Sequence, residues 1–475
     1  MRKPYLGTAA TCAIGAALGG AQAHAQAGED SYFIRDRNVS VVDRVQAYNR
    51  AEGIRTGSFV VRPQLEVGAG WTSNVFALSD SGLPGLEFVE DESALFGFVR
   101  PSVAGVSDWN RHEVRFDGYV EGTGNERFDS ETFVTAGASV GGFMEIDRSS
   151  ELFGAVSFDH LREGREVNNT FLVSEEPVQY DLAQAEIGLR REFGRTRGSV
   201  RFDLSDYDYD DVVVVPIALF QTDEDGERVL GPDGAVLPVL NADGTQAFLA
   251  QGDGDQDFRD HTAYRATAEA AYALSPDTAL VVRGQLEQRD YDGRDQFGLD
   301  RDSEGFRVAA GVEFDLTRLV RGEVTLGYFE RDFEDPQFED ASGLGVDVGV
   351  EWFPTELTTV TLTGSRDVED SPFVNAGGVV REEAVVQIDH ELRRDVSLYA
   401  YGGLGQDRFD DLDRNFDRVR AGVGARYYLN DHLALGASYD YIEQEIDLND
   451  ETDALGAFGA PYDTHRALVT VTVTP

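Results

Sequence analysis

The sequence predicts an all-β protein, a single closed antiparallel transmembrane β-barrel of about 18 strands (16 to 20), with short periplasmic turns and long external loops. Three observations predict this fold. Apolar and polar residues alternate with a period of two, the alternating runs are long, and short turns alternate with longer polar segments. A helical membrane protein is excluded, because mean hydropathy is −0.32 and no apolar run reaches the roughly 18 residues of a membrane helix.

The charge balance is strongly acidic. The chain has 41 basic and 87 acidic residues, a net charge of −46, and Lys3 as its only lysine. Binding to a nucleic-acid backbone requires clustered positive charge, so we expect no nucleic-acid partner. The single cysteine, Cys12, excludes a disulfide framework and a cysteine-rich zinc site.

Residues 1–27 have the pattern of a secretory signal peptide. Arg2 and Lys3 form a short positive region, residues 8–20 are small or apolar, and residues 21–27 contain overlapping A-x-A cleavage sites. The apolar stretch is too short to span a bilayer. We expect cleavage after Ala27, which leaves a mature chain without cysteine.

Long alternating runs predict the strands. From Val61 to Thr72 the odd positions are mostly apolar and the even positions are polar or glycine, and residues 306–316 and 344–352 repeat this pattern. Such alternation marks a strand with one dry and one wet face. Strands of soluble proteins average five or six residues, whereas a tilted strand needs about 9 to 11 to cross a bilayer. The tryptophans fall at predicted strand ends, as residues of aromatic girdles do.

The connections predict the strand count. Eight short turns are expected, near Asp108 to Arg111, Asp147 to Ser150, Gly194 to Gly198, Ser275 to Thr278, Thr317 to Arg321, Pro354 to Glu356, Arg393 to Asp395 and Asn430 to His432. Nine longer polar segments separate them, including Ser73 to Glu92, Leu161 to Pro177, Asp206 to Arg259, Tyr291 to Ser303 and Glu443 to Thr464. These connections join eighteen strands, and because no strand edge can remain unpaired in lipid, the strands must close.

The chain therefore divides into a signal peptide at 1–27, a periplasmic lead segment at 28–58 and an outer-membrane barrel at 59–475. We expect the lead to be flexible, with Val39, Val41 and Val42 as a short docking strand. The lead is too short for the folded plug of a 22-stranded transporter. No long passenger precedes the barrel, which disfavours an autotransporter.

The start of the barrel resembles a known family. Arg37 to Arg44, Gly53 to Phe59, Arg62 to Gly70 and Ser73-Asn74-Val75-Phe76 look like the entry segment of a β-barrel porin family of Gram-negative outer membranes. The resemblance implies an outer-membrane barrel over nearly the whole mature chain, in a family sometimes associated with surface-polysaccharide functions, and it implies no catalytic residues. The final residues 469–475 keep the alternation but lack the terminal aromatic residue common in such barrels.

The wet strand faces predict a charged lumen. A barrel of 16 to 18 strands leaves an aqueous channel, and charges of both signs on its wall orient polar solutes and tune ion selectivity. The simpler alternative is that these charges only wet the lumen and pair between neighbouring strands. The predicted lumen-lining residues are Arg62, Glu66, Arg115, Asp117, Glu121, Arg265, Glu269, Arg283, Glu287, Arg307, Glu313, Asp347, Glu351, Asp389, Arg418 and Arg420.

The longest loop, 206–259, is the best candidate for a constriction. Its apolar run at 212–220 either folds into the barrel mouth or forms a hairpin above the membrane, and the spacing of its glycines slightly favours the hairpin. Acidic residues in the same loop, Asp253, Asp255 and Asp257, could bind Ca²⁺ or Mg²⁺ weakly. The helical calcium-loop pattern is incomplete there, and a solvated anionic surface is the simpler explanation.

We expect no enzymatic activity and no cofactor. Asp159-His160 and Asp260-His261 are adjacent pairs, and adjacent strand residues point to opposite faces, so neither pair forms a dyad by itself. A cross-strand arrangement stays open. The sequence thus predicts an outer-membrane channel for small hydrophilic solutes or saccharides, or alternatively a non-conducting scaffold acting with a surface-polysaccharide export complex. Outer-membrane lipid, lipopolysaccharide and the barrel-assembly machinery are the expected partners, and the oligomeric state is left open.

Overall fold

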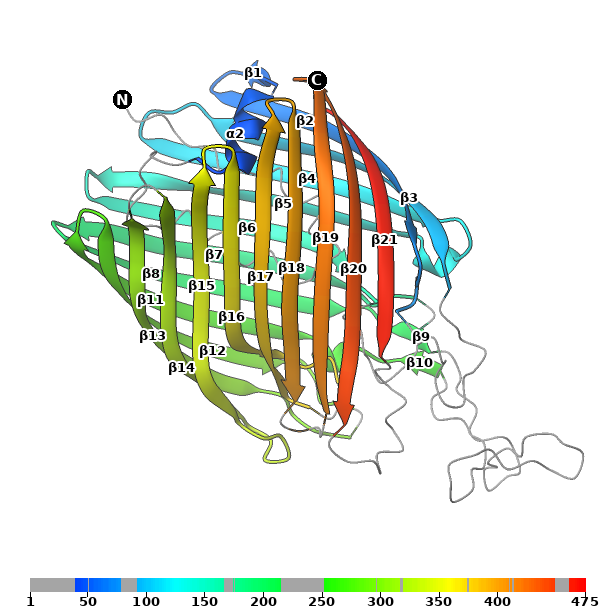
Figure 1. The fold of residues 1–475 in the computed structure, drawn as a ribbon. Coiled ribbons are helices and arrows are strands. Elements are labelled where there is room, and N and C mark those ends of the chain that lie inside the picture. The colour runs from blue at the N-terminus through cyan, green and yellow to red at the C-terminus, as the bar shows by residue number, and fades with distance from the viewer. Residues whose placement is uncertain are drawn as a thin grey trace, which may run out of the picture.

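The structure is a computed structural model in which the strands wind around a single closed barrel (Figure 1). It describes residues 39–49, 51–77, 92–165, 174, 176–214, 252–295, 297–316, 319–373, 376–409, 411, 414–448 and 461–475. The predicted signal peptide lies outside these residues. No helix in the described ranges has the length and apolar character needed to cross a membrane.

Eighteen strands within the described residues form the barrel, and each pairs antiparallel with its neighbour in sequence. The barrel strands are β2 (Phe59–Thr72), β3 (Ala94–Ser107), β4 (His112–Asn125), β5 (Phe133–Asp147), β6 (Ser150–Arg162), β7 (Gln179–Phe193), β8 (Thr196–Tyr209), β11 (His261–Ser275), β12 (Thr278–Tyr291), β13 (Ser303–Leu316), β14 (Val320–Phe333), β15 (Ala341–Thr355), β16 (Thr358–Asp370), β17 (Gly378–Arg393), β18 (Val396–Phe409), β19 (Arg414–Asn430), β20 (Leu433–Leu448) and β21 (Tyr462–Val473). The predicted fold is confirmed.

Pairing between β2 and β21 closes the barrel. The register runs from Leu65 opposite Val473 to Thr72 opposite Arg466. The periplasmic end of β2 extends beyond β21 and pairs instead with the short strand β1 (Ile54–Thr56). This hairpin covers backbone groups that an open strand edge would expose.

The eight predicted turns join the strand pairs at the periplasmic end. The turn between β11 and β12, for example, connects Ser275 directly to Thr278 in the ladder. Gly194, in the turn between β7 and β8, has φ +65°. That left-handed conformation suits glycine because it has no Cβ to clash.

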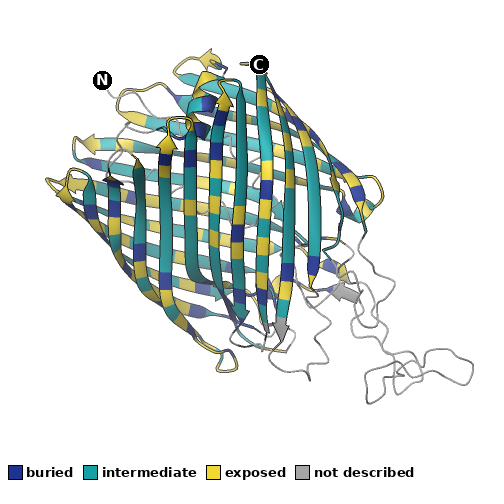
Figure 2. Ribbon diagram, in the orientation of Figure 1, coloured by how far each residue is buried: buried dark blue, intermediate teal, exposed yellow. Residues whose placement is uncertain are grey.

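Side chains alternate between the outer and the inner face of the wall. Large apolar side chains such as Leu286, Leu404 and Val469 are exposed on the outside, where a membrane barrel contacts lipid. Figure 2 shows how exposure changes from residue to residue along the strands. The opposite face is polar, as the period-two pattern predicts.

Aromatic rings on the inner face cover glycines of the next strand. The ring of Tyr401 lies over Gly422, where an added Cβ would be 2.4 Å from its Cε1. Phe98 covers Gly68 and Phe153 covers Gly188 in the same way, with closest distances of 2.2 Å. The missing Cβ lets each ring lie against the wall rather than project into the lumen.

The lead segment differs from the prediction. Residues 41–48 form helix α2 (Val41–Tyr48), not a strand. Ser40 caps the helix, with its Oγ accepting a hydrogen bond from the Asp43 N–H at 3.1 Å. Val41 and Val45 are both 1% exposed, so the buried residues repeat every four positions and not every two.

Helix α2 lies against the inner wall at the periplasmic end (Figure 1). The Val41 N–H donates to Thr359 Oγ1 at 2.9 Å, and Arg44 Nε donates to Glu391 Oε2 at 2.8 Å. Thr359 is on β16 and Glu391 on β17, both on the inner face. The described part of the lead thus contacts the barrel wall, and the expectation of a short docking strand is wrong, because these residues form a helix.

The predicted loop 206–259 begins later than expected, because β8 continues to Tyr209. Within it, β9 (Val212–Val214) and β10 (Gly252–Gly254) pair antiparallel and form the base of a hairpin. This pairing agrees with the hairpin alternative at its base. Residues 215–251, which would show whether the loop enters the mouth, lie outside the described part of the chain.

Candidate functional site: the charged lumen

Contacts between strands that are not neighbours identify the inner face. Arg283 on β12 bridges Glu269 on β11 and Glu323 on β14, at 2.7 and 3.1 Å. Arg307 on β13 reaches Asp367 on β16. Side chains from separated strands meet in this way only on the concave side of a barrel, so these charges lie in the lumen.

All sixteen predicted lumen residues lie on the strand faces that carry these charges. The wall pairs several of them with each other. Arg265 lies 2.7 Å from Glu287, Arg283 2.7 Å from Glu269, and Arg307 2.8 Å from Asp347. Seven others pair with residues outside the predicted set: Glu121 with Arg100, Arg115 with Glu113, Asp117 with Ser139, Glu351 with Arg321, Asp389 with Gln387, Arg418 with Asp407, and Arg420 with Glu383. Glu66 and Glu313 are buried in the wall, at 2% and 3% exposure. Arg62 is half-buried on the same face.

The densest group of charges lies at the external end of β11 to β14. Asp370, the last residue of β16, accepts hydrogen bonds from Arg289 Nη1 at 2.6 Å and Tyr291 OH at 3.3 Å. Arg331 Nη1 lies 3.4 Å from the same oxygen, and His261 Nε2 is 3.6 Å from the other. One carboxylate thus receives groups from three strands. Charge-assisted hydrogen bonds of this kind are roughly twice as strong as neutral ones.

A row of aromatic rings adjoins this cluster. Tyr207 stacks on His261 with ring centroids 4.6 Å apart, and His261 stacks on Tyr291 at 4.7 Å. Tyr180 stacks on Tyr209 at 5.0 Å one step further along the wall. Because the rings face one another across neighbouring strands, they stiffen the wall at the external end.

Of this cluster, only His261 was singled out from the sequence, as a member of the pair Asp260-His261. Arg289 and Tyr291 follow Glu287 at intervals of two residues, so the same alternation predicts that they lie on the inner face. It does not predict this for Asp370, because inner-face residues of β16 such as Thr359 and Asp367 have odd numbers. The alternation of β16 continues to Asp370, but the end of the strand leaves the barrel wall, so that its even-numbered face lies against the inner side of other strands. No local sequence pattern predicts this departure.

Chain segments pack across the external mouth on the same side. Arg301, in the β12–β13 loop and 1% exposed, donates to the carbonyls of Ser371, at 3.0 Å, and Phe373. Its guanidinium lies 4.9 Å from the ring of Phe258. On the far side Phe373 packs with Phe409 and Phe416 of β18 and β19. The β16–β17 connection is therefore held against both sides of this part of the mouth.

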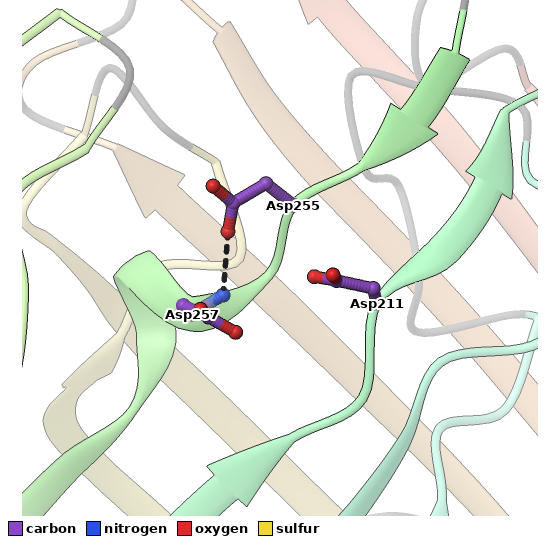
Figure 3. Close-up of side chains that lie close together, drawn as sticks. All are labelled: Asp211, Asp255 and Asp257. Atoms are coloured by element: carbon purple, nitrogen blue, oxygen red, sulfur yellow. Dashed lines mark hydrogen bonds between the residues drawn. The ribbon is translucent and has the colours of Figure 1, made fainter.

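The acidic loop residues form a cluster that differs from the predicted one. Asp211, Asp255 and Asp257 place carboxylate oxygens within 4.8 Å of one another (Figure 3). Asp253 lies in β10, and its side chain is outside the described set. Two of the three carboxylates already accept backbone hydrogen bonds, Asp211 from Gln256 and Asp255 from Asp257, both at 3.0 Å. All three are exposed, as an anionic outer surface requires, and the cation prediction stays a prediction.

Loop burial also changes carboxyl titration. Burial raises the pKa of Asp260 to about 6, although a hydrogen bond from the Tyr209 N–H acts in the opposite direction. Burial and the nearby Asp255 and Asp211 raise the pKa of Asp257. These carboxyls therefore bind protons more readily than free aspartate.

A cross-strand histidine–aspartate pair exists, on the outer face. His160 Nδ1 lies 2.7 Å from Asp181 Oδ1, between β6 and β7. His160 shares its face with the exposed Val156 and Phe158, and Ala136 stands opposite it on β5. The pair is thus a cross-strand hydrogen bond at the outer surface.

The family model described as "Putative beta-barrel porin 2" matches residues 46–227 and 244–472. The chain belongs to this porin family. The match starts within α2 and extends to the last strand, so it covers the barrel and part of the lead. The family resemblance seen in the entry segment is confirmed.

Several solved outer-membrane barrels are similar to this porin-family chain. The FrpB iron transporter from Neisseria meningitidis is 8% identical, with 91% of this chain and 83% of that chain covered and a TM-score of 0.44. The copper transporter OprC is 11% identical, with 89% and 82% covered and a TM-score of 0.44. A bacterial polysaccharide outer membrane secretin is 10% identical, with 86% and 97% covered and a TM-score of 0.34. No curated protein matches the chain.

Proposed function

We propose that this porin-family protein is a channel through which small hydrophilic solutes or saccharides cross the outer membrane, after removal of residues 1–27. The closed eighteen-strand barrel with charges of both signs on its inner wall carries the proposal. A barrel of this strand number encloses water, unlike one of eight strands, which its own side chains fill. Facing charges favour polar solutes over apolar ones.

The proposed activity is passage, without catalysis or a cofactor. Ion pairs such as Arg265 with Glu287 and Arg307 with Asp347 can exchange hydrogen bonds with a passing solute, because their side chains are neither fully buried nor fully exposed. The lipid-facing surface would contact outer-membrane lipid and lipopolysaccharide, and the barrel-assembly machinery would insert the chain.

Single-channel conductance of the refolded mature chain in a planar bilayer tests this proposal. We expect stable conductance steps on the order of a nanosiemens, with a preference for cations because the chain carries a net charge of −46. Folding is checked independently by heat-modifiable mobility on a gel. Folded protein that never conducts would refute the simple channel.

A scaffold barrel is the second candidate, and two observations favour it. Helix α2 occupies part of the periplasmic end, and the β16–β17 connection crosses part of the external mouth. In that case export activity would belong to a partner complex that handles surface polysaccharide. A silent wild-type channel that conducts after removal of α2 would separate a plugged channel from a scaffold.

A further inference from the structure

The external tip of the β16–β17 hairpin turns into the lumen. β15 and β16 pair only as far as Val346 opposite Arg366, although both strands continue beyond that point. Past this point Val368 and Val380 pack against Phe329 and Ala341, which lie on the inner wall of β14 and β15. The tip has left the cylinder of the barrel and lies on its inside.

Asp370 stands at the end of this tip and reaches across to β11, β12 and β14. Its carboxylate lies within 3.6 Å of Arg289, Arg331, Tyr291 and His261, none of which is on a neighbouring strand. The Arg289 and Arg331 side chains are 8% and 5% exposed, whereas Asp370 is 32% exposed. The arginines are thus buried between the wall and the tip, and Asp370 is the more exposed member of the group.

The wall alone carries a surplus of positive charge at this place. Glu287 pairs with Arg265 at 2.7 Å, Arg289 at 2.6 Å and Arg331 at 3.1 Å. Without Asp370, the two buried guanidinium groups of Arg289 and Arg331 share this one carboxylate with the partly exposed Arg265. Buried guanidinium groups need an anion, so the wall requires a second carboxylate from elsewhere.

We propose that Arg289, Arg331, Tyr291 and His261 form a recognition site for the carboxylate of an acidic solute, a sugar acid, which Asp370 occupies in this structure as a tethered substitute. Two arginines supply planar, fixed donors that match a carboxylate, and the tyrosine hydroxyl adds a neutral donor. An acidic solute that displaces Asp370 releases the tip of the hairpin. This inference rests on the proposed channel function and names a solute class for it.

The covalent attachment of Asp370 to the chain sets the solute concentration that is needed to displace it. A group attached by a short connection has an effective local concentration in the millimolar range, so a free carboxylate competes only at similar concentration. Removing the Asp370 charge eliminates this competitor. The apparent affinity for a sugar acid should then rise about tenfold or more, because an uncharged side chain at position 370 no longer neutralises the two arginines.

The test measures block of the single-channel current of the mature chain by D-glucuronate, with D-glucose at the same concentration and matched ionic strength as the neutral probe. We expect millimolar block of the wild type by glucuronate but not glucose. Asp370→Asn should strengthen the block about tenfold, Arg331→Gln should abolish it, and Asp370→Glu should resemble the wild type. Glu369→Gln is the matched control, since Glu369 is the adjacent residue and pairs with Arg381 instead.

Equal block by glucose and glucuronate, or equal block in the wild type and Arg331→Gln, would overturn the inference while leaving the channel intact. An equal change in Asp370→Asn and Glu369→Gln would also overturn it, because the effect would follow total charge. If Asp370→Asn does not fold, the wild-type and Arg331→Gln comparison decides. Absence of conductance in the folded wild type refutes the channel proposal itself, and is distinguishable from these results.

Discussion

Replacing Gly422 by alanine should destabilise the barrel through the ring that covers it. The new Cβ would lie 2.4 Å from Tyr401 Cε1 and 2.6 Å from Asp440 Oδ1, both shorter than any normal contact. Tyr401 must tilt away from the wall and lose its 2.8 Å hydrogen bond to Asp440. A hydrogen bond to a charged group contributes about 1.5–3 kcal/mol. Alanine restricts the unfolded chain more than glycine does, which offsets about 0.4–1 kcal/mol of this and leaves a net loss of about 0.5–2.6 kcal/mol.

Urea unfolding of the mature chain in lipid vesicles, followed by tryptophan fluorescence, measures this loss. Gly349→Ala is the matched control, because Gly349 also lies on the inner face and an added Cβ there meets nothing within 4 Å. We expect the control to be neutral or slightly stabilising, by up to about 1 kcal/mol. Equal unfolding free energies for the two variants would refute the view that glycines hold rings against the wall.

Three further predictions concern the ends of the barrel. Val45→Asp removes about 1.5–3 kcal/mol of stabilisation from apolar burial and should release α2 from the wall, so that a protease cleaves residues 41–48 faster. The control Ala47→Asp changes an exposed position of the same helix and should be cleaved at the wild-type rate. Because the pKa of Asp260 is raised to about 6, its ionised form weakens the fold above that pH; Asp260→Asn should therefore raise the thermal midpoint at about pH 7.5 and leave it unchanged below the unfolded pKa of about 4. A midpoint difference that is independent of pH would contradict this assignment. Added NaCl should raise the thermal midpoint by screening the net charge of −46. A further rise in the midpoint that only calcium produces, and that Asp255→Asn abolishes, would support an ion at the loop cluster.

The wall of the barrel could be predicted from the sequence because every strand between lipid and water must alternate apolar and polar side chains. Turn residues such as Ser275 and Thr278 fall where the alternation stops, and the structure joins the strands there. The inner-face position of residues such as Arg283 and Glu269 follows from the same parity. Their direct pairing needed the register, which a single sequence does not contain.

Features that leave the cylinder could not be predicted in this way. Val39 and Val41 fit a period-two pattern, but the cap at Ser40 and the buried pair Val41 and Val45 favour a helix. Asp370 has the parity of an outer-face residue, and it contacts the inner wall of β11, β12 and β14 only because β16 parts from β15. In both cases contacts with distant strands decide the local conformation, and local propensity is too weak to oppose them.

The seam between β2 and β21 joins the two ends of the barrel sequence, and the barrel is closed only when this pairing forms. Leu65 and Val473 are adjacent in the sheet, yet nearly the whole barrel sequence separates them. Bringing together the ends of a chain of roughly 400 residues costs about 5 kcal/mol in loop-closure entropy, before any pair at the seam forms. Until β21 arrives, β2 and β20 each present an unpaired edge, on which another copy of the chain could nucleate aggregation. Deletion of β21 alone should thus convert a stable membrane protein into an aggregating chain, although every other strand pair is intact.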